Sequence, residues 1–420
     1  MSTLFVTATW PHPLNEFTHG IAQRMRMLLL AAARVDPDLD LLVYGSADDC
    51  ADADGVVAAQ IRSDLGEHWG VWVRHVRLAP LRLVLDRCDS LWLGYLRPIF
   101  GVRWQPAMAR THGEGQTRAL EQALSESRPA RLFVHRLQCM HPVLAQSGAL
   151  PPIVLDLDDI EHRTLSRLIE LPPHWRTKRL MHWWVPTLRR FERRATRAAA
   201  VALVCSETDQ TYLRSAFGLR QIEVVANALP LPVCSPLPAS PTVLFLGLYS
   251  YEPNRVAAET LVHEVWPLVR RALPQAELTI AGKASQLISG FDRPPPGVKF
   301  VGFVQDLDQL YAKSRLVCCP IRSGGGTRMK IIEAALRGRP VVSTPIGAEG
   351  LSFSQAEGEI SIAESPGELA AAVVELLRND ALASHMALAA RAKAQALYSE
   401  GTVLAHLATL LAALAVPARR

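Results

Sequence analysis

The chain has 420 residues, of which 49% are hydrophobic and 20% charged, and 45 basic against 40 acidic side chains give it a formal net charge of +5. This length predicts two domains, each with its own core, and the low charged fraction excludes a disordered chain. So small a charge over so long a chain excludes a generally basic nucleic-acid-binding protein. The seven cysteines follow no metal-binding or disulfide spacing, which favours reduced thiols and a cytoplasmic protein.

Short apolar runs alternate with amphipathic helical stretches along the first half of the chain. We predict strands at 3–8, 39–45, 131–135, 152–157, 200–204 and 222–226, and helices at 20–34 and 107–126. This alternation indicates a parallel sheet covered by helices. The first apolar run lacks a basic start and a long apolar core, so it predicts a strand and not a signal peptide.

A proline-rich segment, residues 228–241, interrupts this rhythm with five prolines in fourteen residues and predicts a linker. Beyond it we predict strands at 242–247, 276–281, 298–302, 315–320 and 340–344, and helices at 254–272, 327–337 and 366–378. The expected fold is α/β, with two doubly wound parallel-sheet domains at 1–227 and 242–398 that face each other across a cleft. The leucines of residues 399–420 have helical spacing, so we expect a buried C-terminal helix on the N-terminal domain and not a membrane span.

The strongest local motif is a run of three glycines, Gly324–Gly326, between an apolar strand and a helix expected to begin near Thr327. Glycines let the backbone approach a ligand, and the free N–H groups at a helix start suit phosphate. Arg328 and Lys330 add positive charge there, where cations are unfavourable unless an anion binds. The alternative is a glycine-rich turn with a solvated helix start. The order of residues is not that of a Walker A motif, and no GxGxxG follows the first strand.

The stretch from Gly324 to Glu333, with Ala334–Leu351 after it, resembles the C-terminal domain of retaining glycosyltransferases of the GT-B fold and the large family 4 type. Phe245–Asn254, Leu278–Gly282 and Val301–Asp306 resemble neighbouring segments of that domain. The resemblance implies two Rossmann-like domains and a sugar transferase of polysaccharide or exopolysaccharide assembly. It implies a nucleoside diphosphate sugar as donor, which could be a UDP-, GDP-, ADP- or dTDP-sugar, with no bound cofactor and no metal.

The resemblance also implies individual roles. Glu333 matches the second glutamate of the family's E-x7-E motif and would contact the ribose, whereas the first glutamate would fall at Gly325. The carboxylate that usually contacts the donor sugar is therefore missing, and backbone N–H groups of Gly325 and Gly326 would replace part of that contact. Arg328 and Lys330 would neutralise the diphosphate. The remaining residues expected at the donor are Gly20, Arg255, Phe303, Val304, Gly324 and Thr327.

A cluster of carboxylates follows the strand predicted at 152–157, where sites of α/β domains gather. The resemblance places Asp158 near the anomeric carbon of the donor, so the expected catalytic residues are Asp158, Arg328, Lys330 and Glu333. Asp158 could instead cap the next helix, as could Asp159, and a metal-binding Asp156-x-Asp158 pair is a weaker alternative. His135 ends another strand and would line the cleft or fill the core.

Residues 172–197 contain eight cations and one acid, a net charge of +7, so all other residues sum to −2. Tryptophans lie among the arginines, and Pro186 is expected to break the segment. The segment predicts either a sheet-packed helix with a solvated face or a dock on an anionic membrane surface.

Two other functions remain open, a nucleotide-sugar 2-epimerase and a non-catalytic nucleotide-binding protein. The expected partners of the transferase are the nucleotide sugar, a sugar or lipid-linked acceptor, and an anionic membrane surface. No nucleic acid is expected. The expected location is the cytoplasm, with peripheral attachment to the inner face of the membrane.

Overall fold

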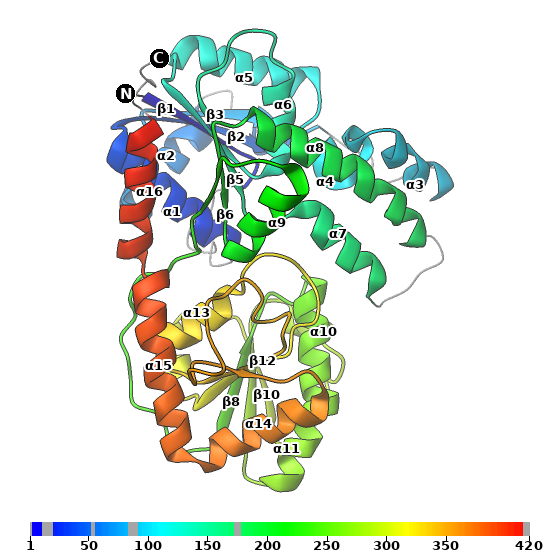
Figure 1. Cartoon of the computed structure of the whole chain (residues 1–420), viewed down its shortest axis with the longest axis vertical. Coiled ribbons are helices and arrows are strands. Elements are labelled where there is room, and N and C mark those ends of the chain that lie inside the picture. Colours follow the sequence, from blue (N-terminus) through cyan, green and yellow to red (C-terminus); the bar gives the residue numbers. More distant parts are fainter. Residues whose placement is uncertain (1, 11–19, 52–54, 83–90, 172–177, 415–420) are drawn as a thin grey trace. The chain divides into compact units, whose positions relative to one another are not determined.

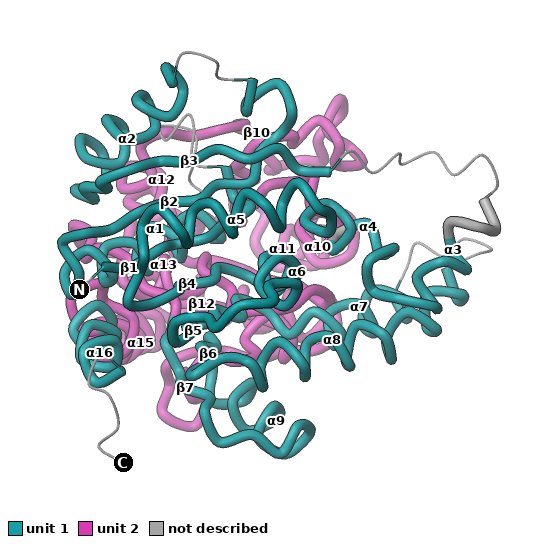
Figure 2. The backbone as a smooth tube through the Cα atoms, turned by 90° about the horizontal axis from the view of Figure 1, so that it is seen from above, with its two compact units in different colours: residues 1–226, 403–420 teal, residues 227–402 magenta. Residues whose placement is uncertain are grey.

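The computed structural model describes residues 2–10, 20–51, 55–82, 91–171 and 178–414. It confirms the predicted fold class, since the chain forms two α/β units that are each built on a parallel sheet (Figure 1). Unit 1 contains residues 1–226 and 403–420, and unit 2 contains residues 227–402 (Figure 2).

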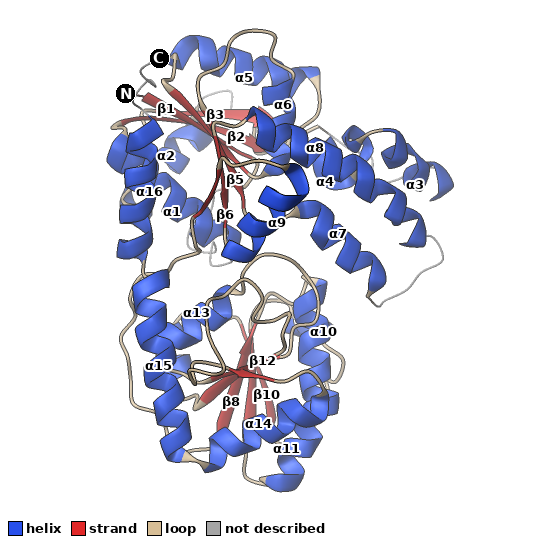
Figure 3. Ribbon diagram, in the orientation of Figure 1, coloured by secondary structure: helices blue, strands red, loops and turns tan. Residues whose placement is uncertain are grey.

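The sheet of unit 1 has seven parallel strands in the order β3-β2-β1-β4-β5-β6-β7. They are β1 (Ser2–Thr7), β2 (Asp38–Gly45), β3 (His75–Pro80), β4 (Arg131–His135), β5 (Ile153–Leu157), β6 (Val201–Val204) and β7 (Ile222–Val224). The inner strands are buried apolar runs because helices cover both faces of the sheet (Figure 3). The prediction missed the edge strand β3, whose sequence mixes charged and apolar residues, and the two-residue edge strand of the other sheet, Ser361–Ile362.

The helices of unit 1 connect these strands. They are α1 (Gly20–Val35), α2 (Val56–Trp69), α3 (Leu91–Phe100), η2 (Val102–Trp104), α4 (Pro106–Ala109), α5 (Glu114–Ser127), η3 (Leu137–Cys139), α6 (Met140–Leu144), α7 (Glu161–Glu170), η4 (Lys178–Trp184), α8 (Val185–Ala198), α9 (Glu207–Phe217) and α16 (Glu400–Leu414). The helix predicted at 107–126 is two helices, since α4 ends at Ala109 and α5 begins after Gly113.

The C-terminal helix α16 joins unit 1 from Val403 onwards. Leu404, Leu407 and Leu411 are buried, and His406 Nε2 lies 3.2 Å from the carbonyl oxygen of Val224. Across the described ranges, no helix has both the length and the apolar character needed to cross a membrane.

The sheet of unit 2 has six parallel strands in the order β10-β9-β8-β11-β12-β13. They are β8 (Thr242–Leu246), β9 (Glu277–Ala281), β10 (Val298–Gly302), β11 (Leu316–Cys319), β12 (Val341–Ser343) and β13 (Ser361–Ile362). The helical elements are α10 (Glu252–Thr260), the π-helix η5 (Leu261–Val265), α11 (Trp266–Ala272), η6 (Ser285–Leu287), α12 (Leu307–Ala312), α13 (Met329–Leu336), α14 (Pro366–Arg378) and α15 (Asp380–Tyr398).

The proline-rich segment lies along unit 2 without regular secondary structure of its own. Buried Arg339 donates hydrogen bonds to the carbonyl oxygens of Ser235 and Pro236, at 2.8 and 3.1 Å. Buried Arg315 donates another to the carbonyl oxygen of Pro238 at 3.0 Å. Because proline disrupts regular ladders, these arginine side chains supply the hydrogen bonds that such carbonyls would otherwise lack.

Candidate functional site

The glycine loop of unit 2 connects β11 to α13, and its shape requires glycine. Gly324 and Gly326 have φ values of +95° and +65°, in the left-handed region that favours glycine. A Cβ atom at Gly324 would also lie 2.8 Å from the Tyr251 hydroxyl. The helix begins at Met329, two residues later than expected, with Arg328 at its N-cap.

The Arg328 side chain folds back onto this loop. It donates hydrogen bonds to the carbonyl oxygens of Ser323 at 3.2 Å and Gly326 at 2.6 Å, and also to that of Gly325. The sequence suggested that a cation at this helix start binds an anionic ligand. The loop carbonyls explain part of its presence there, because they accept its hydrogen bonds. Arg328 holds the loop in shape in the structure.

Lys330 lies in the first turn of α13 and is directed toward α10. Its Nζ donates a hydrogen bond to Asn254 Oδ1 at 2.7 Å and lies 4.5 Å from the centre of the Phe245 ring. Burial lowers the pKa of Lys330 to about 8. The lysine is therefore charged at neutral pH and held at one place beside the loop.

Glu333 lies one turn further along α13, partly exposed. The Tyr311 hydroxyl donates a hydrogen bond to its Oε2 at 3.1 Å, and Arg337 Nη1 lies 3.6 Å from its Oε1. Burial raises the pKa of Glu333 above its ordinary value, although Arg337 and Tyr311 act in the opposite direction. Sequence reasoning missed Tyr311; the only signal was its place among the apolar residues of α12.

The other residues expected at the donor lie in different settings. The Thr327 hydroxyl accepts a hydrogen bond from Asn227 Nδ2 at 2.8 Å. Arg255 is paired along its own helix with Glu259, at 3.2 Å, and with Glu252, at 3.8 Å. Of the two residues expected to bind the base, Phe303 is exposed beneath Lys283 and Val304 packs against the unit 2 core. Gly20 is the first residue of α1 in unit 1.

A second close backbone approach in unit 2 involves Gly282, which follows β9. Its N–H donates to the carbonyl oxygen of Gly302 at 2.6 Å, and its φ is +138°. A Cβ atom there would lie 1.7 Å from the carbonyl oxygen of Gly247. The backbone at the ends of β8 and β9 therefore approaches so closely that Gly282 has no room for a side chain.

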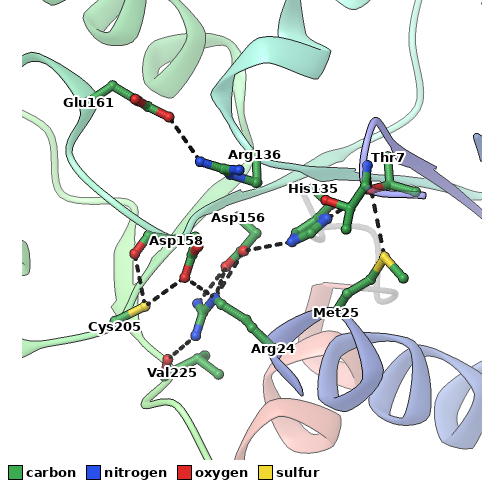
Figure 4. Close-up of polar contacts among 11 residues, drawn as sticks. Thr7, Arg24, Met25, His135, Arg136, Asp156, Asp158, Glu161, Cys205 and Val225 are labelled. Carbon is green, nitrogen blue, oxygen red and sulfur yellow. Dashed lines mark hydrogen bonds and ion pairs between the residues drawn. The ribbon is translucent and has the colours of Figure 1, made fainter. Parts of the chain in front are cut away.

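In unit 1 an ion pair joins the first helix to the ends of β5 and β7 (Figure 4). Arg24 Nε lies 3.0 Å from both carboxylate oxygens of Asp156, and its Nη1 donates to the carbonyl oxygen of Val225 at 3.0 Å. Burial alone lowers the pKa of Arg24, but Asp156, Cys205 and Asp158 together outweigh burial and raise that pKa. Asp156 is thus committed to Arg24, which weakens the reading of Asp156-x-Asp158 as a metal-binding pair.

Asp158 follows β5 directly and is partly exposed. Its Oδ1 lies 3.8 Å from Arg24 Nε and 3.8 Å from the thiol sulfur of Cys205. The alternative that Asp158 or Asp159 caps the next helix is wrong. That helix, α7, has Ile160 at its N-cap, and no side chain caps it from there. The N–H of its first residue, Glu161, donates a hydrogen bond to Glu192 Oε1 at 3.0 Å.

Arg136, at the end of β4, has an unusual backbone conformation. Its φ is +70°, which costs free energy for any residue other than glycine, and such strained residues cluster at functional sites. Its Nη2 lies 3.3 Å from Glu161 Oε1 (Figure 4). Burial, only partly offset by Arg136, raises the pKa of Glu161 to about 7. Sequence reasoning did not select this pair, because nothing local links residues 25 positions apart.

His135 fills the core and does not line a surface. It is fully buried, and its Nδ1 lies 2.9 Å from the Thr7 hydroxyl. Burial lowers its pKa well below the ordinary value, so the ring is neutral. Within the ranges that the structure describes, no group of three His, Cys, Asp or Glu side chains is placed to hold a metal ion.

The basic segment is described from Lys178 onwards, and its residues 172–177 lie outside the described ranges. Pro186 stands in the first turn of α8, where the 3-10 helix η4 gives way to an α-helix. Lys178 and Glu192 are buried. The outward face of α8 carries five exposed arginines, Arg189, Arg190, Arg193, Arg194 and Arg197, as expected.

Comparison with known proteins agrees with this geometry. Residues 240–379 match the family model described as Glycosyl transferases group 1. No curated protein matches the chain significantly. The match confirms the predicted enzyme class, a glycosyltransferase, and places a group 1 domain in unit 2.

Solved structures are similar over nearly the whole chain. Sucrose-phosphate synthase from Thermosynechococcus elongatus has a TM-score of 0.69 and 17% identity, with 99% of each chain covered. HepE from Anabaena, in complex with UDP and glucose, has a TM-score of 0.62 and 18% identity, over 98% of this chain and 100% of that one. TarM of S. aureus has a TM-score of 0.68 and 12% identity, over 98% of both. At these identities the likeness shows the fold, which is GT-B.

Proposed function

We propose that this chain transfers a sugar from a nucleoside diphosphate sugar to an acceptor hydroxyl with retention of anomeric configuration, as an enzyme of the family 4 type. The observation that carries the proposal is the β11–α13 connection, where a glycine loop, Lys330 and Glu333 follow one another inside the group 1 domain. We further propose that the product belongs to a polysaccharide or another glycoconjugate.

The donor would bind to unit 2 through groups of different kinds. Backbone N–H groups of Gly325 and Gly326, the start of α13 and the Lys330 ammonium supply positive charge for a diphosphate. Glu333 would accept hydrogen bonds from the ribose hydroxyls, since its carboxylate is held by Tyr311 and Arg337 and remains partly exposed. Exposed Phe303 offers an apolar face to the base.

In the proposed reaction the bond between the anomeric carbon and the diphosphate oxygen breaks, and the acceptor oxygen bonds to that carbon. The bonding electrons leave with the diphosphate, which also takes up the acceptor's proton. Positive charge fixed beforehand at Lys330 and the helix start lowers the energy of this charged leaving group. Arg328 contributes by keeping the loop in place, and Asp158 of unit 1 is proposed to act near the anomeric carbon.

The HepE structures of Anabaena contain UDP, glucose or UDP-glucose. This supports testing UDP-sugars first. The acceptor is proposed to be a sugar or a lipid-linked sugar bound by unit 1, in the cytoplasm and next to the inner face of the membrane.

A thermal-shift screen with UDP-, GDP-, ADP- and dTDP-glucose tests the donor, because a ligand that binds only the folded chain raises its melting temperature. Release of nucleoside diphosphate in the presence of candidate acceptors then tests transfer. We expect Lys330→Ala and Glu333→Ala to lower both binding and turnover at least tenfold. Lys299→Ala is the matched control, since Lys299 forms an exposed ion pair with Glu277 in the same unit.

The proposal is overturned if both site variants turn over donor as the unmodified chain does. Conversion of the donor to an epimer without any acceptor would identify the 2-epimerase. Nucleotide binding without transfer or hydrolysis, over a broad acceptor panel, would identify a non-catalytic binding protein.

A further inference from the structure

One helical arm of unit 1 combines exposed apolar side chains with exposed arginines. The arm consists of α3, η2, η4 and the first half of α8, which pack beside one another away from the centre of the sheet (Figures 1 and 3). The rings of Tyr95 and Trp184 stack with centres 5.6 Å apart, and Trp184 Nε1 donates to the carbonyl oxygen of Tyr95 at 2.7 Å. Thr187 Oγ1 donates to the carbonyl oxygen of Pro98 at 3.1 Å. Segments nearly ninety positions apart therefore form one surface.

Large apolar side chains project from this arm into solvent. Phe100 is 84% exposed and Trp183 is 63% exposed, and Leu96 and Trp104 are each more than a third exposed. Leu96 and Phe100 are one turn apart, so they share a face of α3. Folding gains nothing from side chains left in water, and a concentration of them indicates a partner that covers them.

The charges on the arm are of one sign. Arg97 and Arg103 lie 5.5 and 5.3 Å from the centre of the Trp104 ring, and Arg179 of η4 is exposed. Residues 91–113 and 178–191 contain no Asp or Glu at all. A protein partner that covers the apolar groups would have to supply every balancing acid, whereas an anionic lipid surface supplies negative charge and an apolar layer together.

A groove continues the arm along α8. It encloses about 340 Å³ and is lined by Pro186 and Phe217 together with Arg189, Arg190 and Arg193. Within the described part of the chain, none of these three arginines forms an ion pair with an acid. Guanidinium groups around a small groove suit the phosphate of a lipid headgroup.

We propose that this arm docks unit 1 on the surface of an anionic lipid bilayer. Phe100 and Trp183 enter the boundary between headgroups and acyl chains, and the arginines of the arm and groove contact lipid phosphates. The sequence suggested only residues 172–197 for such a role, whereas the apolar contacts come mainly from α3 and η2. The inference does not depend on the proposed transfer reaction and is tested without any nucleotide sugar.

The experiment is flotation of the full chain with vesicles of phosphatidylcholine alone or with 30 mol% (about one third) phosphatidylglycerol. We expect binding to the anionic vesicles only, and its loss at about 0.5 M salt. Arg189→Gln with Arg190→Gln should lower the partition coefficient about fivefold per arginine. Phe100→Ser with Trp183→Ser should lower it at least tenfold.

Two substitutions elsewhere in unit 1 serve as controls, and all variants are first checked for an unchanged melting temperature. Trp72→Ala removes a tryptophan that is 69% exposed but lies outside the arm, and Arg118→Gln removes an exposed arginine of α5. Both should bind vesicles like the unmodified chain. Equal binding to neutral and anionic vesicles, no binding at all, or equal losses in arm and control variants would overturn the proposal. So would a dimer, seen by light scattering, that the Phe100 and Trp183 changes dissociate.

Discussion

Lys330 Nζ and Asn254 Oδ1 are 2.7 Å apart, and this hydrogen bond ties the first turn of α13 to the first turn of α10. The two residues lie 76 positions apart and approach each other because β8 and β11 are neighbours in the sheet. The amide accepts from the ammonium without neutralising it, so the positive charge beside the glycine loop remains available to an anion.

This arrangement predicts how nucleotide binding depends on pH. The pKa of Lys330 is lowered to about 8, so its charge is lost as the pH rises through that value and not near its ordinary 10.5. The affinity for UDP or another nucleoside diphosphate should fall above pH 8, by up to about tenfold per pH unit. Lys330→Arg keeps its charge and should bind with little change up to pH 9.5 or so. Calorimetric titration measures the nucleotide affinity of both proteins at each pH. An affinity of the unmodified chain that does not change with pH would refute the role given to the Lys330 charge.

Arg328 should matter for the stability of the loop. Arg328→Ala leaves the carbonyl oxygens of Ser323, Gly325 and Gly326 without this donor, and we expect a loss of about 2 kcal/mol in the free energy of unfolding of unit 2. Urea denaturation followed by tryptophan fluorescence measures the shift. Arg322→Ala is the control, since exposed Arg322 donates to a single carbonyl, that of Glu364. An equal shift in both variants would contradict the role given to Arg328.

Glu161 should make unit 1 less stable as the pH rises. Its pKa is about 7 in the folded chain, above the ordinary 4.5, so the folded state holds the proton more tightly. The protonated Glu161 side chain therefore stabilises the folded state fully below about pH 4.5, and this contribution is lost as the pH rises through 7. The free energy of unfolding should fall by on the order of 1–2 kcal/mol over this range, because solvent partly screens the group. Glu161→Gln carries no titrating group and should show a flatter profile. Thermal unfolding between pH 5 and 8 or so tests this, with Glu207→Gln on the surface of α9 as the comparison.

The close approach of Gly282 to Gly247 should not tolerate a side chain. Gly282→Ala places a Cβ atom 1.7 Å from the Gly247 carbonyl oxygen and also strains a backbone with φ of +138°. We expect a loss of more than about 2 kcal/mol in stability and a weaker fit of the base, because the ends of β8 and β9 must separate. Gly367→Ala is the control, since nothing lies within 4 Å of a Cβ atom there. Comparable stability of the two variants would show that the approach is not needed.

Much of the fold follows from local pattern. Apolar runs such as Leu4–Val6 and Val317–Cys319 become strands buried on both faces, and the prolines of 228–241 exclude any regular element. The glycine loop was also recognisable, because a strand, glycines and a helix start are contiguous in the chain. The helix predicted at 107–126 was wrong in the middle, where residues 110–113 form a turn between α4 and α5.

The amino-acid sequence by itself determined the α/β class, most of the strands, and that glycines and cations gather before α13. Only the tertiary structure decided what those cations do: Arg328 turns to carbonyls of its own loop, while Lys330 reaches Asn254. It likewise decided that Asp156 pairs with Arg24, 132 positions away. The reason is physical. Periodicity and turn chemistry act over a few residues, whereas the partner of a side chain depends on which strands become neighbours, and that is settled by packing of the whole sheet.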